Sequence, residues 1–351
     1  MHRCLRTLSE AGYRCLLLGR ERPGSKPLDP ALPFAQERHR LRASSGKHFY
    51  WQLNRAHYRR LKSLRPRAIL VVDLDTMWSG ARAAARLGVP WVYDAHELFT
   101  DTPEVDHRPL IKRAWRWLAE RYVARAAARY TVGEHIAREH ATRYGCAFGV
   151  VRNYPEARPS RGHAGERAGR FTVIYQGALN AGRGLEQLIE AVAQRDDFDV
   201  WIVGTGDLDG ELRSRVPLSA RSRVTFWGER TPAELAAVTR RAHLGYALME
   251  DRGLNYRLSL SNKSVDYVHA GLPSLQMDWP EYRRIHEAYG CYLLVQTLSV
   301  GSLLQAIESA RAAHRYEFME VGCRAAAADL TWASQAPELL RIWRSVLPPS
   351  A

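Results

Sequence analysis

Short apolar runs alternate with segments of helical periodicity along the first half of the chain. Residues 68–72 and 89–93 are such runs, and residues 78–87 between them repeat apolar side chains at helical spacing and end before Gly88. Strands that alternate with helices form a parallel sheet covered on both faces. The pattern predicts an α/β fold, with further helices at 2–11 and 110–129 and further strands at 13–18 and 130–132.

The alternation resumes in the second half, after residues 152–170, which lack periodicity and are rich in proline, glycine and charge. Thr231 and Glu234 have capping-box spacing, which predicts a helix start. Strands are expected at 171–176, 199–203, 224–227, 244–248 and 273–277, and helices at 185–194 and 262–270. The 351 residues therefore predict two domains, 1–155 and 171–328, a linker at 156–170 and a terminal segment at 329–351.

The start of the chain departs from the usual order of a doubly wound domain. Such a domain begins with its central strand, whereas the first periodic segment here, residues 2–11, is helical. The first strand of the N-terminal domain, and the loop after it, are therefore expected to be missing from this reading frame.

Composition narrows the classes of function. A net charge of +14 attracts phosphorylated substrates, an anionic membrane surface or nucleic acid, although a solvated arginine-rich surface explains it equally well. Nucleic acid is not expected as a partner, because no recognition motif is present. The five cysteines lack metal-ligand spacing, so neither a zinc site nor a disulfide framework is expected. Without a signal-peptide pattern or a long apolar run, the expected location is cytoplasmic.

A glycine-rich loop follows the first predicted strand of the second domain, between Tyr175 and Glu186. Glycines such as Gly177 let backbone approach a phosphate, and Arg183 supplies a guanidinium fork for it. An ordinary turn between a strand and a helix has the same composition, so the loop alone does not decide between the two.

A second polar segment leads into the helix predicted at 262–270. Ser261, Asn262 and Lys263 lie at the start of this helix, and Asp266 lies one turn further on. Helix N-termini attract anions, so a diphosphate fits here and the carboxylate fits ribose hydroxyls. In the alternative interpretation, Asn262 is an N-cap and Asp266 a solvated residue.

A third candidate group follows strand 89–93. His96 lies beside Asp94 and Glu97, and Asp73 and Asp75 end the neighbouring strand. A histidine in this setting can act as an acid, a base or a hydrogen-bond donor near neutral pH. The alternative is a structural histidine that caps a helix.

Together these segments resemble the retaining glycosyltransferases of family 4, in particular the bacterial branch that builds surface polysaccharides. The matching motifs are VDLDT (72–76), VYDAHELF (92–99), YQGALNAGRGLEQLIEA (175–191), VGTGDL (203–208), VTFWGE (224–229) and SNKSVDYVHAGLPSL (261–275). The resemblance implies a GT-B fold, in which two Rossmann-like doubly wound domains face a central cleft. It also implies that the helix at 329–351 crosses back to the N-terminal domain.

The resemblance implies roles for the candidate residues. His96 lies near the transferred sugar and the acceptor, with Asp75 and Glu97 on the acceptor side. Gly177, Arg183 and the backbone at Ser261, Asn262 and Lys263 face the donor diphosphate. Asp266 holds the ribose, and Gly204 and Gly206 border the base. Glu250, upstream of Asp266, is the candidate for the second catalytic group.

The implied reaction moves a sugar from a UDP- or GDP-sugar to a hydroxyl of a glycan or lipid-linked acceptor, with retention and without a metal or other cofactor. Ala178 replaces one arginine of the family's loop. This keeps an alternative open, an inactive GT-B protein that is a partner or regulator of an active transferase. A nucleotide-sugar epimerase of GT-B shape is a further alternative, but the additional carboxylates that it needs are not found.

Contact with an anionic membrane surface is expected if the acceptor is lipid-linked, which would add a peripheral location at the inner face of the membrane. Residues 48–65 and 111–129 are basic and aromatic, and the second stretch, with Trp115 and Trp117, resembles an interfacial helix. The alternative is an amphipathic helix packed on the sheet with its tryptophans inside.

Overall fold

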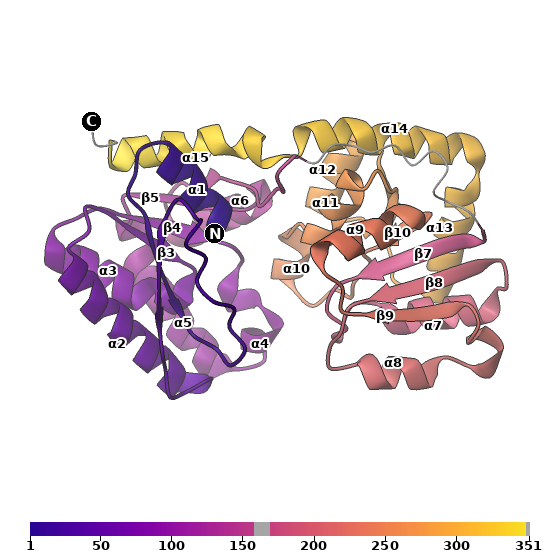
Figure 1. Cartoon of the computed structure of the whole chain (residues 1–351), viewed down its shortest axis with the longest axis horizontal. Coiled ribbons are helices and arrows are strands. Elements are labelled where there is room, and N and C mark those ends of the chain that lie inside the picture. Colours follow the sequence, from indigo (N-terminus) through magenta and orange to yellow (C-terminus); the bar gives the residue numbers. More distant parts are fainter. Residues whose placement is uncertain (158–168, 349–351) are drawn as a thin grey trace. The chain divides into compact units, whose positions relative to one another are not determined.

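A computed structural model describes residues 1–157 and 169–348 and divides the chain into two compact units (Figure 1). Unit 1 comprises Met1–Arg152, Gly253–Asn255 and the segment from Trp332 onwards, and unit 2 comprises Asn153–Arg252 and Tyr256–Thr331. Most of the predicted linker lies outside the described residues. No helix in the described part of the chain is both long and apolar enough to cross a bilayer.

Unit 1 contains two parallel sheets and the helices that cover them. Its strands are β1 (Leu16–Arg20), β2 (Ala35–His39), β3 (Ile69–Val72), β4 (Trp91–Ala95), β5 (Ala128–Thr131) and β6 (Gly149–Val150). Its helices are α1 (His2–Glu10), α2 (Gly46–Leu64), α3 (Met77–Leu87), α4 (Pro103–Asp106), α5 (Pro109–Tyr122), α6 (Glu134–Tyr144) and α15 (Trp332–Val346), with 3₁₀ turns at Leu74–Thr76, Phe99–Asp101 and Val123–Arg125.

The β3–β6 sheet is buried between two layers of helices. Val71 and Tyr93 on one face pack with α2, α3 and α5, while Val92 on the other face packs with α1 and α15. In Figure 1, α15 runs beside α1 along the edge of unit 1, and the Trp332 indole donates to Thr7 Oγ1 at 2.8 Å. Burial on both faces explains why these strands have continuous apolar sequences.

The sheet of unit 1 is interrupted between β1 and β3. β1 pairs with β2 in a sheet of two strands, and β3, β4, β5 and β6 form a separate sheet of four. Among residues 1–157, no strand joins the two sheets. Leu16, Leu17 and Leu18 of β1 are only half-buried, although three consecutive apolar residues are typical of a strand buried on both faces. The gap corresponds to the first position of a 3-2-1-4-5-6 order, where the sequence predicts a missing strand.

Unit 2 has one parallel sheet of six strands in the order β12-β11-β10-β7-β8-β9. Its strands are β7 (Phe171–Gln176), β8 (Phe198–Val203), β9 (Val224–Gly228), β10 (Leu244–Tyr246), β11 (Ser274–Met277) and β12 (Tyr292–Val295). Its helices are α7 (Leu185–Gln194), α8 (Asp209–Arg215), α9 (Pro232–Arg241), α11 (Asn262–His269), α12 (Pro280–Tyr289), α13 (Val300–Arg311) and α14 (Ala313–Asp329), with a 3₁₀ turn at Leu218–Ala220. The short α10 (Leu254–Leu258) precedes α11.

The strand order of unit 2 is that of a Rossmann-type sheet, 3-2-1-4-5-6. The order reverses between β7 and β10, which pair directly. Chains of this topology bind ligands at the carboxyl ends of the strands that flank the reversal. The loops after β7 and β10 are therefore the first place to look for a site in this unit.

Most of the predicted elements are confirmed, and the differences have physical reasons. The capping box of Thr231 and Glu234 is present at the start of α9, and α3 ends before Gly88 in a left-handed conformation. The strand expected at 13–18 begins later, at Leu16, and the helix expected to continue to residue 129 ends at Tyr122. β2 was not predicted, because its sequence Ala-Gln-Glu-Arg-His is polar and gives no apolar signal.

Candidate functional site

The loops after β7 and β10 contact each other at the reversal of the unit 2 sheet. The Glu250 amide donates to the Gly182 carbonyl at 3.0 Å, and the Arg252 side chain packs against Gly182. The Glu250 carboxylate accepts hydrogen bonds from Arg252, the shorter at 2.8 Å. Glu250 is therefore engaged in an ion pair at the edge of this group, and its predicted catalytic role stays a prediction.

Glycine allows the loops after β7 and β8 to approach each other at backbone distance. Gly204 has a φ of +138°, and a Cβ there would lie 2.0 Å from the Gly177 carbonyl oxygen. A Cβ on Gly206 would lie 2.5 Å from the Leu179 amide nitrogen. The glycines of both motifs thus have a packing reason to be glycine, in addition to the phosphate contact that the sequence predicts.

Lys263 lies in the first turn of α11 and reaches back over β7. Its Nζ is 3.9 Å from the centroid of the Tyr175 ring, and it would lie 3.6 Å from a Cβ on Gly177. Burial and, to a smaller extent, the charge of Arg183 lower the pKa of Lys263 to about 7. The ammonium is thus placed beside the glycine-rich loop in surroundings that disfavour its charge.

Arg183 is the second cation of this group. Its guanidinium carbon lies 5.6 Å from the centroid of the Tyr256 ring. In the described part of the chain, neither Arg183 nor Lys263 forms an ion pair with a carboxylate, and the two cations repel each other. Two neighbouring cations without a counter-ion among the described residues, at the switch point of a Rossmann-type sheet, have the charge and the position to attract an anion.

The other predicted donor residues lie around the start of α11. Ser261 is its N-cap, and its amide donates to Tyr282 Oη at 3.2 Å. The Asn262 side-chain oxygen accepts from Asn153 at 3.2 Å, so it does not cap the helix as the alternative interpretation supposed. Asp266 is half-buried one turn further along α11. The amide groups of the first turn are therefore on the same helix end as Lys263.

A second polar group lies at the carboxyl ends of β3 and β4 in unit 1. The His96 amide donates to Asp73 Oδ1 at 2.8 Å, and His96 Nε2 lies 3.1 Å from Asp94 Oδ2. Asp94 is buried, whereas the His96 side chain is 31 % exposed. Asp73 has a left-handed φ of 52°, which costs energy in a residue with a side chain and holds its carboxylate at the His96 backbone.

The two carboxylates keep the His96 imidazole protonated. Burial by itself lowers the pKa of His96, but the hydrogen bond to Asp94 and the charges of Asp94 and Asp73 outweigh it and raise the pKa to about 9. Burial raises the pKa of the Asp73 carboxyl. His96 is thus a cation at neutral pH that can donate a hydrogen bond from Nδ1, an atom with no hydrogen-bond partner among the described residues.

Asp75 and Glu97, predicted on the acceptor side, belong to the same group of charged residues as His96. Burial raises the pKa of Asp75 to about 6 and also raises the pKa of Glu97. Glu97 hydrogen-bonds to the side chain of Asn255, whose Oδ1 also accepts from the Leu98 amide at 2.9 Å. The buried Asn255 therefore holds the loop that carries His96 and Glu97.

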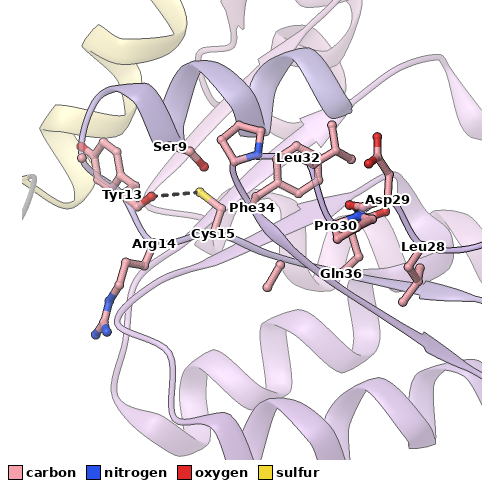
Figure 2. A pocket seen from close by; sticks show the side chains of 13 residues that line it. Ser9, Tyr13, Arg14, Cys15, Leu28, Asp29, Pro30, Leu32, Phe34 and Gln36 are labelled. Atoms are coloured by element: carbon pink, nitrogen blue, oxygen red, sulfur yellow. Dashed lines mark hydrogen bonds between the residues drawn. The ribbon is translucent and has the colours of Figure 1, made fainter.

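One cavity of unit 1 is lined by residues other than those of the His96 group. It has a volume of about 840 Å³ and lies between the end of α1, the start of β1 and the loop before β2. Figure 2 shows Tyr13 and Cys15 at one end and Leu28 and Asp29 at the other. In the described residues, no three His, Cys, Asp or Glu side chains converge as metal ligands, in this cavity or elsewhere.

Two family models account for most of the chain. Residues 1–153 match Glycosyltransferase Family 4, and residues 170–312 match Glycosyl transferases group 1. The chain is a GT-B glycosyltransferase. No curated protein matches it in a sequence search.

Solved structures share the fold of this glycosyltransferase over nearly its whole length. Sucrose-phosphate synthase from Thermosynechococcus elongatus has a TM-score of 0.80 at 15 % identity, covering 99 % of this chain and 92 % of its own. HepE from Anabaena, in complex with UDP and glucose, has a TM-score of 0.74 at 17 % identity, covering 97 % and 94 %. WaaG, a glycosyltransferase involved in lipopolysaccharide biosynthesis, has a TM-score of 0.66 at 14 % identity, covering 97 % and 94 %.

Sequence reasoning about this glycosyltransferase missed the residues that support the predicted ones. Tyr175 lies under Lys263, Arg252 pairs with Glu250, and Asn255 orders the His96 loop. No periodic pattern marks any of them. Only the position of Tyr175 at the end of β7, next to the glycine-rich loop, could have pointed to it.

Proposed function

We propose that this glycosyltransferase takes its sugar from a UDP- or GDP-sugar and transfers it to a hydroxyl with retention of configuration. The observation that carries the proposal is the pair Lys263 and Arg183, two cations at the switch point of the unit 2 sheet that have no carboxylate partner among residues 1–157 and 169–348. A nucleotide diphosphate has the matching charge. The neighbour HepE was solved with UDP and with UDP-glucose, which favours UDP as the first nucleotide to test.

The chemistry needs stabilisation of the departing diphosphate, and the proposal gives this role to three groups. Lys263 and Arg183 contact the phosphate oxygens, and the amide groups of the first turn of α11 add the positive end of the helix dipole. Gly177 leaves room for the diphosphate beside Lys263, Gly204 and Gly206 border the base, and Asp266 holds the ribose. No metal ion is required, because the cations of the chain itself carry the charge.

His96 donates a hydrogen bond to the sugar rather than acting as a nucleophile or a base. Its Nε2 is bound to Asp94 and its pKa is raised to about 9, so the imidazolium is a poor base at neutral pH. The acceptor hydroxyl attacks on the face from which the diphosphate leaves, and its proton passes to the departing phosphate oxygen. Attack on this face retains the configuration. Asp75 and Glu97 contact the acceptor.

The acceptor is a glycan or a lipid-linked saccharide, and the reaction takes place in the cytoplasm, where a lipid-linked acceptor would be met at the inner face of the membrane. WaaG, which is involved in lipopolysaccharide biosynthesis, shares the fold and makes this class of acceptor the first to screen. Glu250 stays a candidate catalytic carboxylate, provided that the substrate releases it from Arg252.

The test is calorimetric titration with UDP and GDP, followed by a screen for hydrolysis of UDP- and GDP-sugars by the native chain and by His96→Ala. Binding of one diphosphate and slow hydrolysis that the His96→Ala variant loses are expected. Unchanged hydrolysis in His96→Ala would remove His96 from the mechanism. If neither UDP nor GDP gives a heat of binding, the proposed donor site is wrong.

Ala178, in place of one arginine of the family's loop, favours one competing function, that of an inactive GT-B partner or regulator of an active transferase. The same titration separates the two functions, because a partner protein without a donor site gives no heat with any nucleotide.

A further inference from the structure

The outward faces of α2, α3 and α5 in unit 1 carry cations with almost no acid. The three helices contain a single acidic residue, Glu120, and nine exposed lysines and arginines; two further cations, Arg60 and Lys112, are less exposed and pair with acids of neighbouring elements. They pack side by side, since α3 contacts both α2 and α5. We call their outward-facing side the basic face.

Exposed aromatic and aliphatic side chains lie among these cations. Trp51 on α2 is 60 % exposed, and Trp117 and Leu110 on α5 are 61 % and 81 % exposed. Single exposed apolar residues are common on protein surfaces. Here, however, two tryptophans and a leucine share one layer of helices with nine exposed lysines and arginines.

The cations and the tryptophans are in contact on two of the helices. The Arg55 guanidinium carbon is 5.2 Å from the centroid of the Trp51 ring, and that of Arg82 is 5.4 Å from the Trp78 ring. On α5, Arg113 and Arg121 are exposed, four residues before and after Trp117. Each exposed tryptophan therefore has an arginine beside it.

The tryptophans of α5 divide between the core and the surface. Trp115 packs with Tyr50 and Phe99 at ring distances of 5.0 and 4.9 Å, so this residue is inside, as the packed-helix alternative predicted. Trp117 is outside. α5 therefore packs against the rest of unit 1 through Trp115 and exposes Trp117 to solvent.

We propose that the basic face binds the surface of an anionic lipid bilayer. Arginines pair with lipid phosphates, while tryptophan and leucine side chains enter the boundary between headgroups and acyl chains. A nucleic acid would pair its phosphates with the arginines but would not bury Leu110 and the neighbouring Ile111. A lipid surface can do both, so it fits the face better. The inference does not depend on the proposed transfer reaction, because it concerns residues outside the His96 group.

Co-sedimentation of the full chain with vesicles, without any nucleotide-sugar, tests the proposal. Phosphatidylcholine vesicles are compared with vesicles that also contain phosphatidylglycerol. We expect binding only to the anionic vesicles. The variant Arg113→Gln/Arg116→Gln should weaken this binding by about tenfold or more at low salt, and Trp51→Ser/Trp117→Ser should abolish the part of the binding that resists high salt.

A matched control comes from unit 2, where Leu218 is 79 % exposed and Arg221 is also exposed. Leu218→Ser/Arg221→Gln should bind vesicles like the native chain. Because the changed side chains are exposed, each variant should unfold at the same temperature as the native chain, and a measurement of Tm shows that it is folded. Lack of binding to anionic vesicles would overturn the proposal. The proposal would also be overturned if the chain bound duplex DNA more tightly than vesicles and Trp51→Ser/Trp117→Ser did not change vesicle binding. The face would then be a general binding surface for polyanions.

Discussion

Replacement of Lys263 by methionine should stabilise this glycosyltransferase and at the same time remove most of its affinity for a nucleotide diphosphate. Lys263 is charged in water but lies against Tyr175 and near Arg183, with no carboxylate partner among the described residues. Methionine keeps the length and most of the apolar contacts of the lysine stem. The substitution therefore removes a charge while changing the packing little.

The magnitudes follow from the pKa of Lys263. The difference between its usual value of 10.5 and about 7 corresponds to roughly 5 kcal/mol at most. Since the side chain is only partly buried by its surface area, we expect a gain in stability of about 1–3 kcal/mol, which raises the Tm by a few degrees. A charged hydrogen bond to a phosphate contributes about 1.5–3 kcal/mol, so the affinity for UDP should fall roughly 10- to 150-fold.

Differential scanning calorimetry measures the stability and titration calorimetry the affinity. The stability gain should be largest at pH 7 and below, where the folded native chain holds the charged ammonium. It should shrink as the pH rises toward 10.5, because the folded protein then buries a neutral amine. Lys112→Met is the control, because Lys112 pairs with Asp101 and Asp106 and its loss should not stabilise the chain or change UDP binding. A Lys263→Met variant that is less stable than the native chain, or that binds UDP equally well, refutes the reasoning.

Three further predictions concern the His96 group, the metal and the loop glycines. Asp94→Asn removes the hydrogen bond and the charge that keep His96 protonated up to about pH 9. In a pH–rate profile, the activity of this variant should therefore fall at a pH at least two units lower than that of the native chain. Coincident profiles would contradict this role of Asp94. Exhaustive EDTA treatment should leave sugar transfer unchanged, and recovery of lost activity by Mg²⁺ or Mn²⁺ would contradict the role given to Lys263 and Arg183. Gly204→Ala should destabilise the chain by about 2–4 kcal/mol in urea unfolding, because its Cβ would lie 2.0 Å from the Gly177 carbonyl oxygen, whereas Gly210→Ala in α8 has open space and should be neutral or stabilising.

The sequence predicted the fold well because local signals and topology agree in this chain. Apolar runs separated by helical segments dictate a parallel sheet, and the glycine-rich loop after β7 lies where the Rossmann order places a ligand. Elements without an apolar signal were missed, and so was the apolar strand β12, Tyr292–Val295. β2 has one alanine among polar residues, and α2 was noted only as a basic, aromatic stretch, since its buried residues include Asn54 and His57.

The electrostatics of the candidate site could not be predicted in the same way. The low pKa of Lys263 depends on burial against groups such as the Tyr175 ring and on the charge of Arg183, and these residues lie 88 and 80 positions away along the chain. His96 depends on Asp73, 23 residues earlier, and its loop depends on Asn255, 157 residues from Leu98. These pairs are consequences of the packed structure. Spacing along the sequence does not reveal them.

The two groups have opposite electrostatic arrangements, and this difference separates their contributions to the reaction. In unit 2, Lys263 and Arg183 have no counter-ion, so Lys263 is charged only below about pH 7 until a phosphate arrives and raises its pKa. In unit 1, His96 has carboxylates at both its backbone and its ring, and it stays charged up to about pH 9. Donor binding should therefore weaken by up to about tenfold per pH unit above 7, while the turnover of bound donor should hold until the pH approaches 9. In kinetic terms, KM for the nucleotide-sugar rises first and kcat falls later. A chain in which both parameters changed at the same pH would have a single titrating group, and the assignment of donor binding to Lys263 and of hydrogen-bond donation to His96 would then be wrong.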